Sequence, residues 1–146
     1  MTPRQSIAAE CARRGHDAVV TGCLELLHGH ADTGTATSTD AALYRSLAGP
    51  AAEPVLQGKA GGLDGYWPRV WGARGLLYAW DDRAAAAIIH ATNDEAWRVR
   101  EMALRVIARH LVGDAIECVV ERRTDPNARV RRAAHRAAER LLAARA

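Results

Sequence analysis

The sequence contains no phenylalanine and few aromatic residues of any kind, which make up 5% of the chain. Alanine supplies much of its apolar fraction of 49%. Small alanine side chains suit closely packed helices, whereas strands favour β-branched and aromatic residues. The composition therefore favours an all-α fold and offers little from which to build a sheet.

Long apolar runs are also missing. No segment approaches the roughly 18 uninterrupted apolar residues of a transmembrane helix. The N-terminal residues include Arg4 and Glu10 but no apolar stretch of the kind that marks a signal peptide. Cys11, Cys23 and Cys118 are odd in number and widely spaced, which argues against a disulfide framework or a zinc site. We expect a cytoplasmic protein that does not associate with membranes and keeps its cysteines reduced and buried.

Lysine is almost absent, since Lys59 is the only one, and arginine supplies the positive charge. The formal net charge of +3 is unevenly divided along the chain. Residues 1–65 hold five Lys/Arg and seven Asp/Glu, whereas residues 66–146 hold fifteen and ten. The excess of positive charge therefore lies in the second half of the chain.

A turn-and-helix motif near the C-terminus predicts how the chain is built. Asp125 is a favourable N-cap, and Pro126 suits the first position of a helix. From Val130 onward, apolar residues recur at the spacing of one helix face. The same plan occurs 31 residues earlier, from Asp94, and 29 residues before that, from Gly65. Repetition at about 30 residues indicates a solenoid of helical units.

The expected elements follow from this period and from the turn residues. We predict helices over 3–14, 17–28, 40–48, 51–58, 66–79, 82–92, 95–111, 114–123 and 127–144, with a mobile loop over 28–39. One domain over 1–146 is expected to comprise a cap helix in 1–15, degenerate repeats in 16–49 and 50–80, and clearer repeats in 81–112 and 113–146. The predicted fold is all-α, a right-handed α–α superhelix of about nine helices in antiparallel pairs.

The pattern Asp-Pro-x-x-Arg-Val-Arg-x-x-Ala-x-x-Ala, at Asp125–Ala137, resembles the second-helix signature of HEAT repeats. The short period resembles the HEAT-like variety also found in phycobilin lyases. The third repeat has Glu95 in place of proline, and the second has Gly65 and Tyr66 in place of Asp-Pro. The resemblance implies helical-repeat architecture and binding of macromolecules on a concave face lined by the second helices. It implies no reaction.

Three arginines, Arg69, Arg98 and Arg129, occupy one position of the repeat. In HEAT-like families an arginine there bonds to carboxylates and carbonyls of the turns. The resemblance therefore assigns these arginines a structural role, with Asp94 and Asp125 as their partners.

Further arginines recur at spacings of three and four, which align side chains on one face of a helix. The two rows are Arg98, Glu101, Arg105 and Arg109 in the third repeat, and Arg129, Arg132, Arg136 and Arg140 in the fourth. Three interpretations stay open: a solvated helix face, a site for an acidic protein, and a site for nucleic acid.

The tryptophans lie close together in the sequence, at Trp67, Trp71, Trp80 and Trp97. They either fill space where the repeats are irregular or line a recess beside the arginines. Aromatic rings next to arginine stack on bases or anchor a protein partner. Trp71 takes the position of Arg100 and Arg131, which favours an exposed ring.

Arg74 departs most from its repeat, because its counterparts, Ala103 and Ala134, lie on the core face. An unpaired buried charge is costly. We therefore expect an ion pair with Asp81 or Asp82, with a ligand-binding role as the alternative.

No set of residues matches a catalytic, metal or nucleotide-binding signature. The predicted function is a non-catalytic binding module, monomeric or homodimeric and without a cofactor, that binds another protein through its concave face. The alternatives are a nucleic-acid-binding protein related to HEAT-like DNA glycosylases and a HEAT-like enzyme such as a lyase. The candidate binding residues are Trp67, Trp71, Arg74, Trp97, Arg98, Arg105, Arg109, Arg132 and Arg136.

Overall fold

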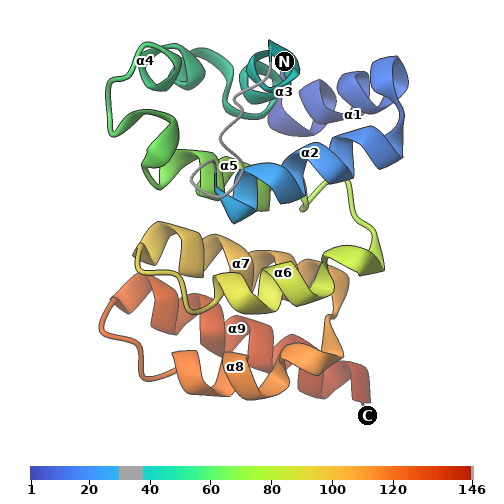
Figure 1. Ribbon diagram of the computed structural model, residues 1–146. Coiled ribbons are helices and arrows are strands. Elements are labelled where there is room, and N and C mark those ends of the chain that lie inside the picture. The colour runs from blue at the N-terminus through green and yellow to red at the C-terminus, as the bar shows by residue number, and fades with distance from the viewer. Residues whose placement is uncertain (30–37, 146) are drawn as a thin grey trace. The chain divides into compact units, whose positions relative to one another are not determined.

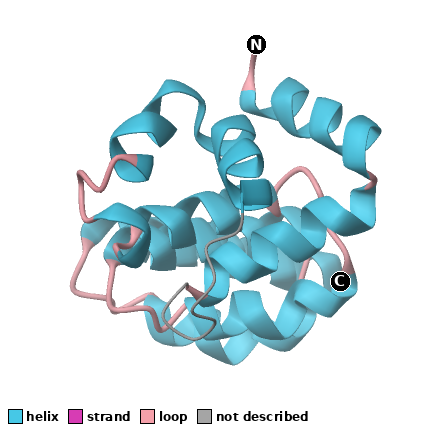
Figure 2. Ribbon diagram, turned by 45° about the horizontal axis from the view of Figure 1, so that its top comes forward, coloured by secondary structure: helices cyan, strands magenta, loops and turns pink. Residues whose placement is uncertain are grey.

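The computed structural model describes the backbone of residues 1–29 and 38–145, together with their side chains except those of 38–40. The regular structure in these ranges is helical, and no strand occurs in them (Figures 1 and 2). The all-α prediction is confirmed. The loop predicted over 28–39 lies largely outside the described residues. No helix in the described part of the chain has both the length and the apolar character of a membrane span.

The chain divides into two compact units, Met1–Asp81 and Asp82–Ala146, and each is described by itself. The first contains α1 (Pro3–Arg14), α2 (His16–His28), α3 (Ser38–Ala48), α4 (Ala52–Leu56) and α5 (Trp67–Gly75), with 3-10 turns at Gly49–Ala51 and Gly62–Asp64. The start of α1 is as predicted, because Thr2 and Gln5 form a capping box and Pro3 begins the first turn.

The helix α2 is central to the first unit. It packs extensively against α5 and also against α1, while its contact with α3 is small. The helix α3 packs against α1, α4 and α5. The pairing predicted for the early repeats, α2 with α3 and α4 with α5, is therefore not the main packing of this unit.

Two glycines allow the close approach of α5 to α2. A Cβ atom on Gly72 would lie 2.6 Å from the carbonyl oxygen of Cys23, and one on Gly75 would collide with the Cys23 sulfur. Cys23 is fully buried between the helices, and this burial raises the pKa of its thiol to about 12. All three cysteines are free, but Cys11 and Cys118 are only half-buried, so the predicted burial holds for Cys23 alone.

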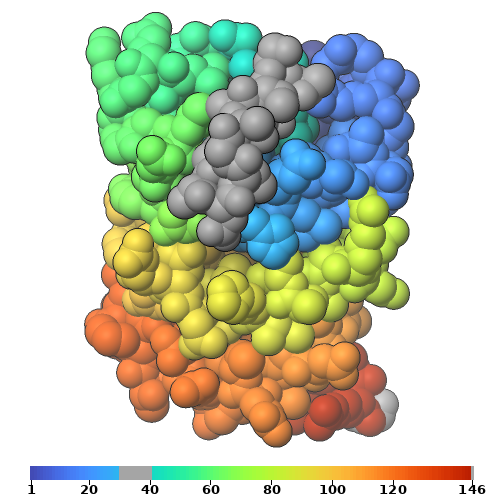
Figure 3. Space-filling model, in the orientation of Figure 1, coloured from blue at the N-terminus to red at the C-terminus, as the bar shows by residue number. Residues whose placement is uncertain are grey.

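The second unit contains α6 (Ala85–Ala91), α7 (Trp97–His110), α8 (Ile116–Arg122) and α9 (Ala128–Arg145), with 3-10 turns at Asp82–Ala84 and Gly113–Ala115. The helix α6 packs on α7, α8 packs on α9, and α7 packs on α9. In Figure 3 the yellow surface of α6 and the orange surface of α8 belong to this unit. Its core is rich in alanine and β-branched residues such as Val99, Ile107 and Ala137.

The helices α7 and α9 run parallel, one repeat apart (Figure 1). Near their N-termini, Arg129 on α9 pairs with Glu101 on α7 at 3.1 Å. Near their C-termini, Arg140 Nε donates a hydrogen bond of 2.8 Å to the carbonyl oxygen of Ala108, 32 residues earlier in the chain. Equivalent positions of the two repeats therefore lie side by side along both helices.

The replacement Gly72→Ala tests the packing of α5 on α2. In an open helix, alanine is more favourable than glycine by roughly 0.5–1 kcal/mol. Here the added methyl group meets the α2 backbone, so we expect the free energy of unfolding to fall by about 1–3 kcal/mol. Urea unfolding followed by circular dichroism measures this change.

The matched control is Gly113→Ala, because a Cβ atom there meets nothing within 4 Å. Its effect is expected to stay within about 0.5 kcal/mol. A Gly72→Ala variant that is as stable as the wild type, or more so, would contradict the packing described here.

Candidate functional site

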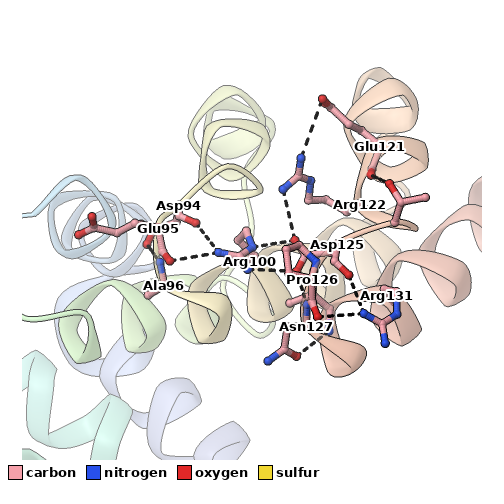
Figure 4. A network of polar contacts seen from close by, with 12 residues as sticks. Asp94, Glu95, Ala96, Arg100, Glu121, Arg122, Asp125, Pro126, Asn127 and Arg131 are labelled. Atoms are coloured by element: carbon pink, nitrogen blue, oxygen red, sulfur yellow. Dashed lines mark hydrogen bonds and ion pairs between the residues drawn. The ribbon is translucent and has the colours of Figure 1, made fainter.

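A buried carboxylate organises the turn between α8 and α9 (Figure 4). Asp125 is 2% exposed, and Arg100 donates to it twice, from Nε at 2.9 Å and from Nη2 at 3.0 Å. Arg122 Nη1 donates to Oδ2 at 3.2 Å, and the amide of Asn127 donates to Oδ1 at 2.9 Å. Two guanidinium groups and four donated bonds thus compensate the buried charge, as a buried carboxylate requires.

Arg100 also binds the turn of its own repeat. Its Nη1 donates to the carbonyl oxygens of Asp94 and Glu95, at 2.9 and 3.1 Å, in the turn before α7. Its other nitrogens reach Asp125, 25 residues further along the chain. One guanidinium group therefore ties the turns of two successive repeats together (Figure 4).

The same local contacts recur one repeat later. Arg131 Nη1 donates to the carbonyl oxygens of Asp125 and Pro126, at 2.7 and 3.0 Å. Asp94 Oδ1 accepts from the amide of Ala96 at 2.8 Å, just as Asp125 accepts from the amide two residues after it. These contacts are therefore part of the repeat.

The sequence assigned the linking role to a position two residues earlier, which holds Arg98 and Arg129. For Arg129 this prediction is wrong, because its guanidinium pairs with Glu101. Two residues are about 200° around a helix, so the side chains of Arg100 and Arg131 lie on the side opposite Arg98 and Arg129. The linking arginine is the second arginine of the Arg-Val-Arg sequence.

The N-cap prediction also needs correction. Asp125 supports the turn from inside, while Asn127 caps α9: its Oδ1 accepts from the amides of Arg129 and Val130, at 2.9 and 3.3 Å. Pro126 precedes the helix and does not begin it.

The arginine rows of α7 and α9 form one exposed surface, which we call the arginine face: Arg105, Arg109, Arg132 and Arg136. None of these four guanidinium groups makes a hydrogen bond or ion pair with another described residue. Successive arginines on one helix are about 6 Å apart along its axis. Packed helices lie about 8–10 Å apart. Four positive charges without a hydrogen bond or ion pair to a described residue thus share a small area, although Glu139 lies three residues from Arg136.

The arginine face ends, on its N-terminal side, in a group of four residues that we call the Trp97 cluster: Trp97, Arg98, Glu101 and Arg129. Arg98 lies over the Trp97 ring at 4.4 Å from its centroid, and Arg129 at 5.5 Å. The Arg129 side chain is 64% exposed, whereas that of Glu101 is 15% exposed. The indole is therefore covered by cations, and one carboxylate engages Arg129.

The predicted exposure of Trp71 is wrong. Trp71 is 5% exposed; its ring packs edge-on against Tyr44 at 4.8 Å and stacks on Trp67 at 5.6 Å, between ring centroids. A guanidinium at this position must stay near carboxylates and carbonyls, but an indole gains free energy from burial. Trp71 therefore belongs to the core of the first unit and lines no recess.

Arg74, on α5, is half-buried, and its guanidinium has no hydrogen bond or ion pair with another residue of the described chain. The ion pair predicted with Asp81, the acid of its own unit, is therefore not formed. A half-buried arginine can lay its methylene groups on apolar neighbours and keep its charge in water. The candidate residues thus separate: Trp67, Trp71 and Arg74 belong to the first unit, and the others to the second.

Two functional features of the second unit were not recognised from the sequence. The Arg100–Asp125 link could have been found from the recurrence of arginine at 100 and 131. The Glu101–Arg129 pair had no local signal, because it joins two helices. The structure places no group of three metal-ligating side chains together within the residues it describes.

Comparisons of the chain with known protein families, with curated proteins and with solved structures found no match. The resemblance to HEAT repeats therefore rests on the motif alone. A function for this chain has to be argued from its own residues and their contacts.

The replacement Asp125→Asn tests the buried link. It leaves Arg100 and Arg122 without their carboxylate, so we expect a loss of about 3–5 kcal/mol in the free energy of unfolding at neutral pH. The exposed Asp114→Asn in the same unit removes the same charge and is expected to change stability by less than about 0.5 kcal/mol.

The effect of Asp125 should depend on pH. Burial by itself raises the pKa of Asp125, but the hydrogen bonds from Arg100 and the Asn127 amide, with the charges of Arg100 and Arg122, outweigh it and lower the pKa from its ordinary value of 3.8. Its stabilisation is therefore complete above about pH 5 and is lost as the pH falls below the ordinary value. Urea unfolding of wild type and Asp125→Asn should give stabilities that approach one another as the pH falls below about 3.8 and through the lowered pKa of Asp125 in the folded protein. A difference that stays constant from neutral to acidic pH would show that the charge of Asp125 contributes nothing.

Proposed function

We propose that this chain is a non-catalytic binding module of the HEAT-like kind, and that it binds an acidic segment of another protein through the arginine face. The observation that carries the proposal is the set of four exposed guanidinium groups on two parallel helices, none of which has a hydrogen bond or ion pair to a described residue. The arginine face consists of guanidinium groups and contains no cysteine or serine that could act as a nucleophile. We therefore propose no reaction.

Two features of the second unit support HEAT-like architecture. Equivalent helices of successive repeats, α7 and α9, pack in parallel and in register. Each is preceded by a turn whose carbonyl oxygens accept from an arginine six residues later, at Arg100 and Arg131. We propose that the two rows of arginines lie on the concave side of a short right-handed superhelix.

A protein partner is favoured over nucleic acid by the state of Trp71 and Trp97, the two tryptophans that interrupt or border the arginine positions of the repeats. Binding of single strands usually adds stacking of bases on aromatic rings to the attraction between charges. Trp71 is buried in the first unit, and Trp97 is covered by Arg98 and Arg129. The groups left to bind a partner are the guanidinium groups of the arginine face. Their planar fork fits a carboxylate with two parallel hydrogen bonds.

Nucleic acid is the second candidate, because the same four charges would also attract phosphates. The two partners differ in an observable way. Phosphate contacts would give strongly salt-dependent binding to DNA of any sequence. Carboxylate contacts would give binding to acidic peptides that exceeds binding to DNA of similar length.

The test uses two fluorescent probes, a glutamate-rich peptide and a single-stranded DNA of about ten residues each, at about 50 mM salt. We expect the peptide to bind more tightly than the DNA, as measured by fluorescence anisotropy. The double replacement Arg105→Gln/Arg136→Gln removes one arginine from each row. It should weaken peptide binding roughly two- to thirtyfold, because each exposed ion pair contributes about 0.2–1 kcal/mol.

The matched control is Arg123→Gln/Arg145→Gln. Both arginines are exposed residues of the same unit and lie off the arginine face, so the net charge changes equally. Tighter binding of DNA than of peptide would favour the second candidate. If neither probe binds, or if both double variants lose the same affinity, the arginine face is not a binding site.

A further inference from the structure

We infer that Glu101 limits the arginine face at its N-terminal end by occupying Arg129 with an internal carboxylate. Arg129, the arginine of the Trp97 cluster that borders this face, is thereby withheld from the partner. This inference rests on the proposed function and specifies which part of the surface the partner's acidic residues use.

The first step concerns the repeat register. Glu101 on α7 and Arg132 on α9 are 31 residues apart and occupy equivalent positions. One row therefore carries a negative charge where the other carries a positive one. Since α7 and α9 pack in parallel, this charge lies beside the start of the α9 row, and the nearest arginine there, Arg129, pairs with it at 3.1 Å.

The second step concerns the quality of this pair. The distance between Arg129 Nε and Glu101 Oε2 is that of an ion pair, yet Oε2 is buried and receives no hydrogen bond. The contact is therefore poorly directed, whereas a carboxylate arriving from solvent can meet the guanidinium with two aligned bonds. The Arg129 side chain is 64% exposed, so its guanidinium would be accessible to such a carboxylate once Glu101 is neutralised.

The third step concerns the position of Arg129 without Glu101. Its guanidinium lies over the Trp97 ring, 5.5 Å from the centroid. The attraction between a cation and the indole face does not depend on the carboxylate. Neutralising Glu101 should therefore leave Arg129 at the edge of the arginine face and free to bind.

These steps specify the partner's chemistry. The acidic run of the partner should lie along Arg105, Arg109, Arg132 and Arg136 and should end before the Trp97 cluster. A partner carboxylate placed there would meet the charge of Glu101, which repels it. Glu101 thus acts on specificity as well as on affinity.

The experiment uses the glutamate-rich peptide and the variants Glu101→Gln, Arg129→Gln and the double variant. Glu101→Gln should bind the peptide roughly two- to fivefold more tightly than wild type, the value of one additional exposed ion pair. Its binding should also weaken more steeply with added salt, because one more ion pair is screened. Arg129→Gln alone should bind nearly as wild type, and the double variant should lose the gain of Glu101→Gln.

The control is Glu139→Gln, which removes a negative charge from an exposed position of α9 without releasing an arginine. An equal gain in this variant would show a general charge effect and overturn the inference. If the wild type binds the peptide and Glu101→Gln binds it with the same affinity, the inference is overturned and the proposed function stands. If no variant binds the peptide, both are overturned.

Thermal unfolding checks that each variant folds. If Glu101→Gln does not fold, Arg129→Gln decides the question, because a loss of affinity as large as that of Arg105→Gln would show that Arg129 already binds the probe.

Discussion

The ion pair between Arg100 and Asp125 is the contact on which the second unit depends. The buried face of α9 is rich in alanine, with Ala134, Ala137 and Ala138, and small side chains alone do little to specify how far two helices are shifted along one another. A guanidinium with bonds to two turns does not permit such a shift, because its donors have fixed directions. The buried pair therefore holds the turns before α7 and α9 in one relative position, while the apolar side chains supply the contact between the helices. Fixing a register is the best attested use of a buried charge.

The two arginines of the Arg-Val-Arg sequence have separate roles because of where they lie around the helix. Arg100 and Arg131 bond to the turns, and Val99 and Val130 between the arginines are fully buried. Arg98 and Arg129, the first arginines of the two sequences, lie on the same side of their helices as the arginine rows. One short motif therefore gives each helix a core residue, a link to the turns and the first member of an exposed row.

The sequence predicted helices, their approximate ends and the period of the repeat, because these depend on local patterns of apolar and turn residues. It misplaced the linking arginine by two positions, since the period aligns Arg98 with Arg129 and Arg100 with Arg131 equally well. Only the rotation of the helix relative to its neighbour distinguishes the two alignments.

The packing of the first unit could not be predicted from the sequence, for a different reason. Gly72 and Gly75 reveal a close helix contact only when the facing residue, Cys23, is known. At Trp71, alignment to the repeat predicted exposure, whereas the large apolar ring is buried against Tyr44. The identity of a side chain outweighed its place in the repeat.

The arginine face is tolerated without a partner because its repulsion is small. Two unit charges about 8 Å apart in water repel by roughly 0.5 kcal/mol. A few such pairs cost less than the burial of two core side chains such as Val99 and Ile107, each of which contributes about 1.5–3 kcal/mol. The second unit can therefore hold its like charges together, and an anionic partner would relieve that repulsion. Burial of the apolar core, together with the internally paired Asp125, thus outweighs the repulsion among the arginines.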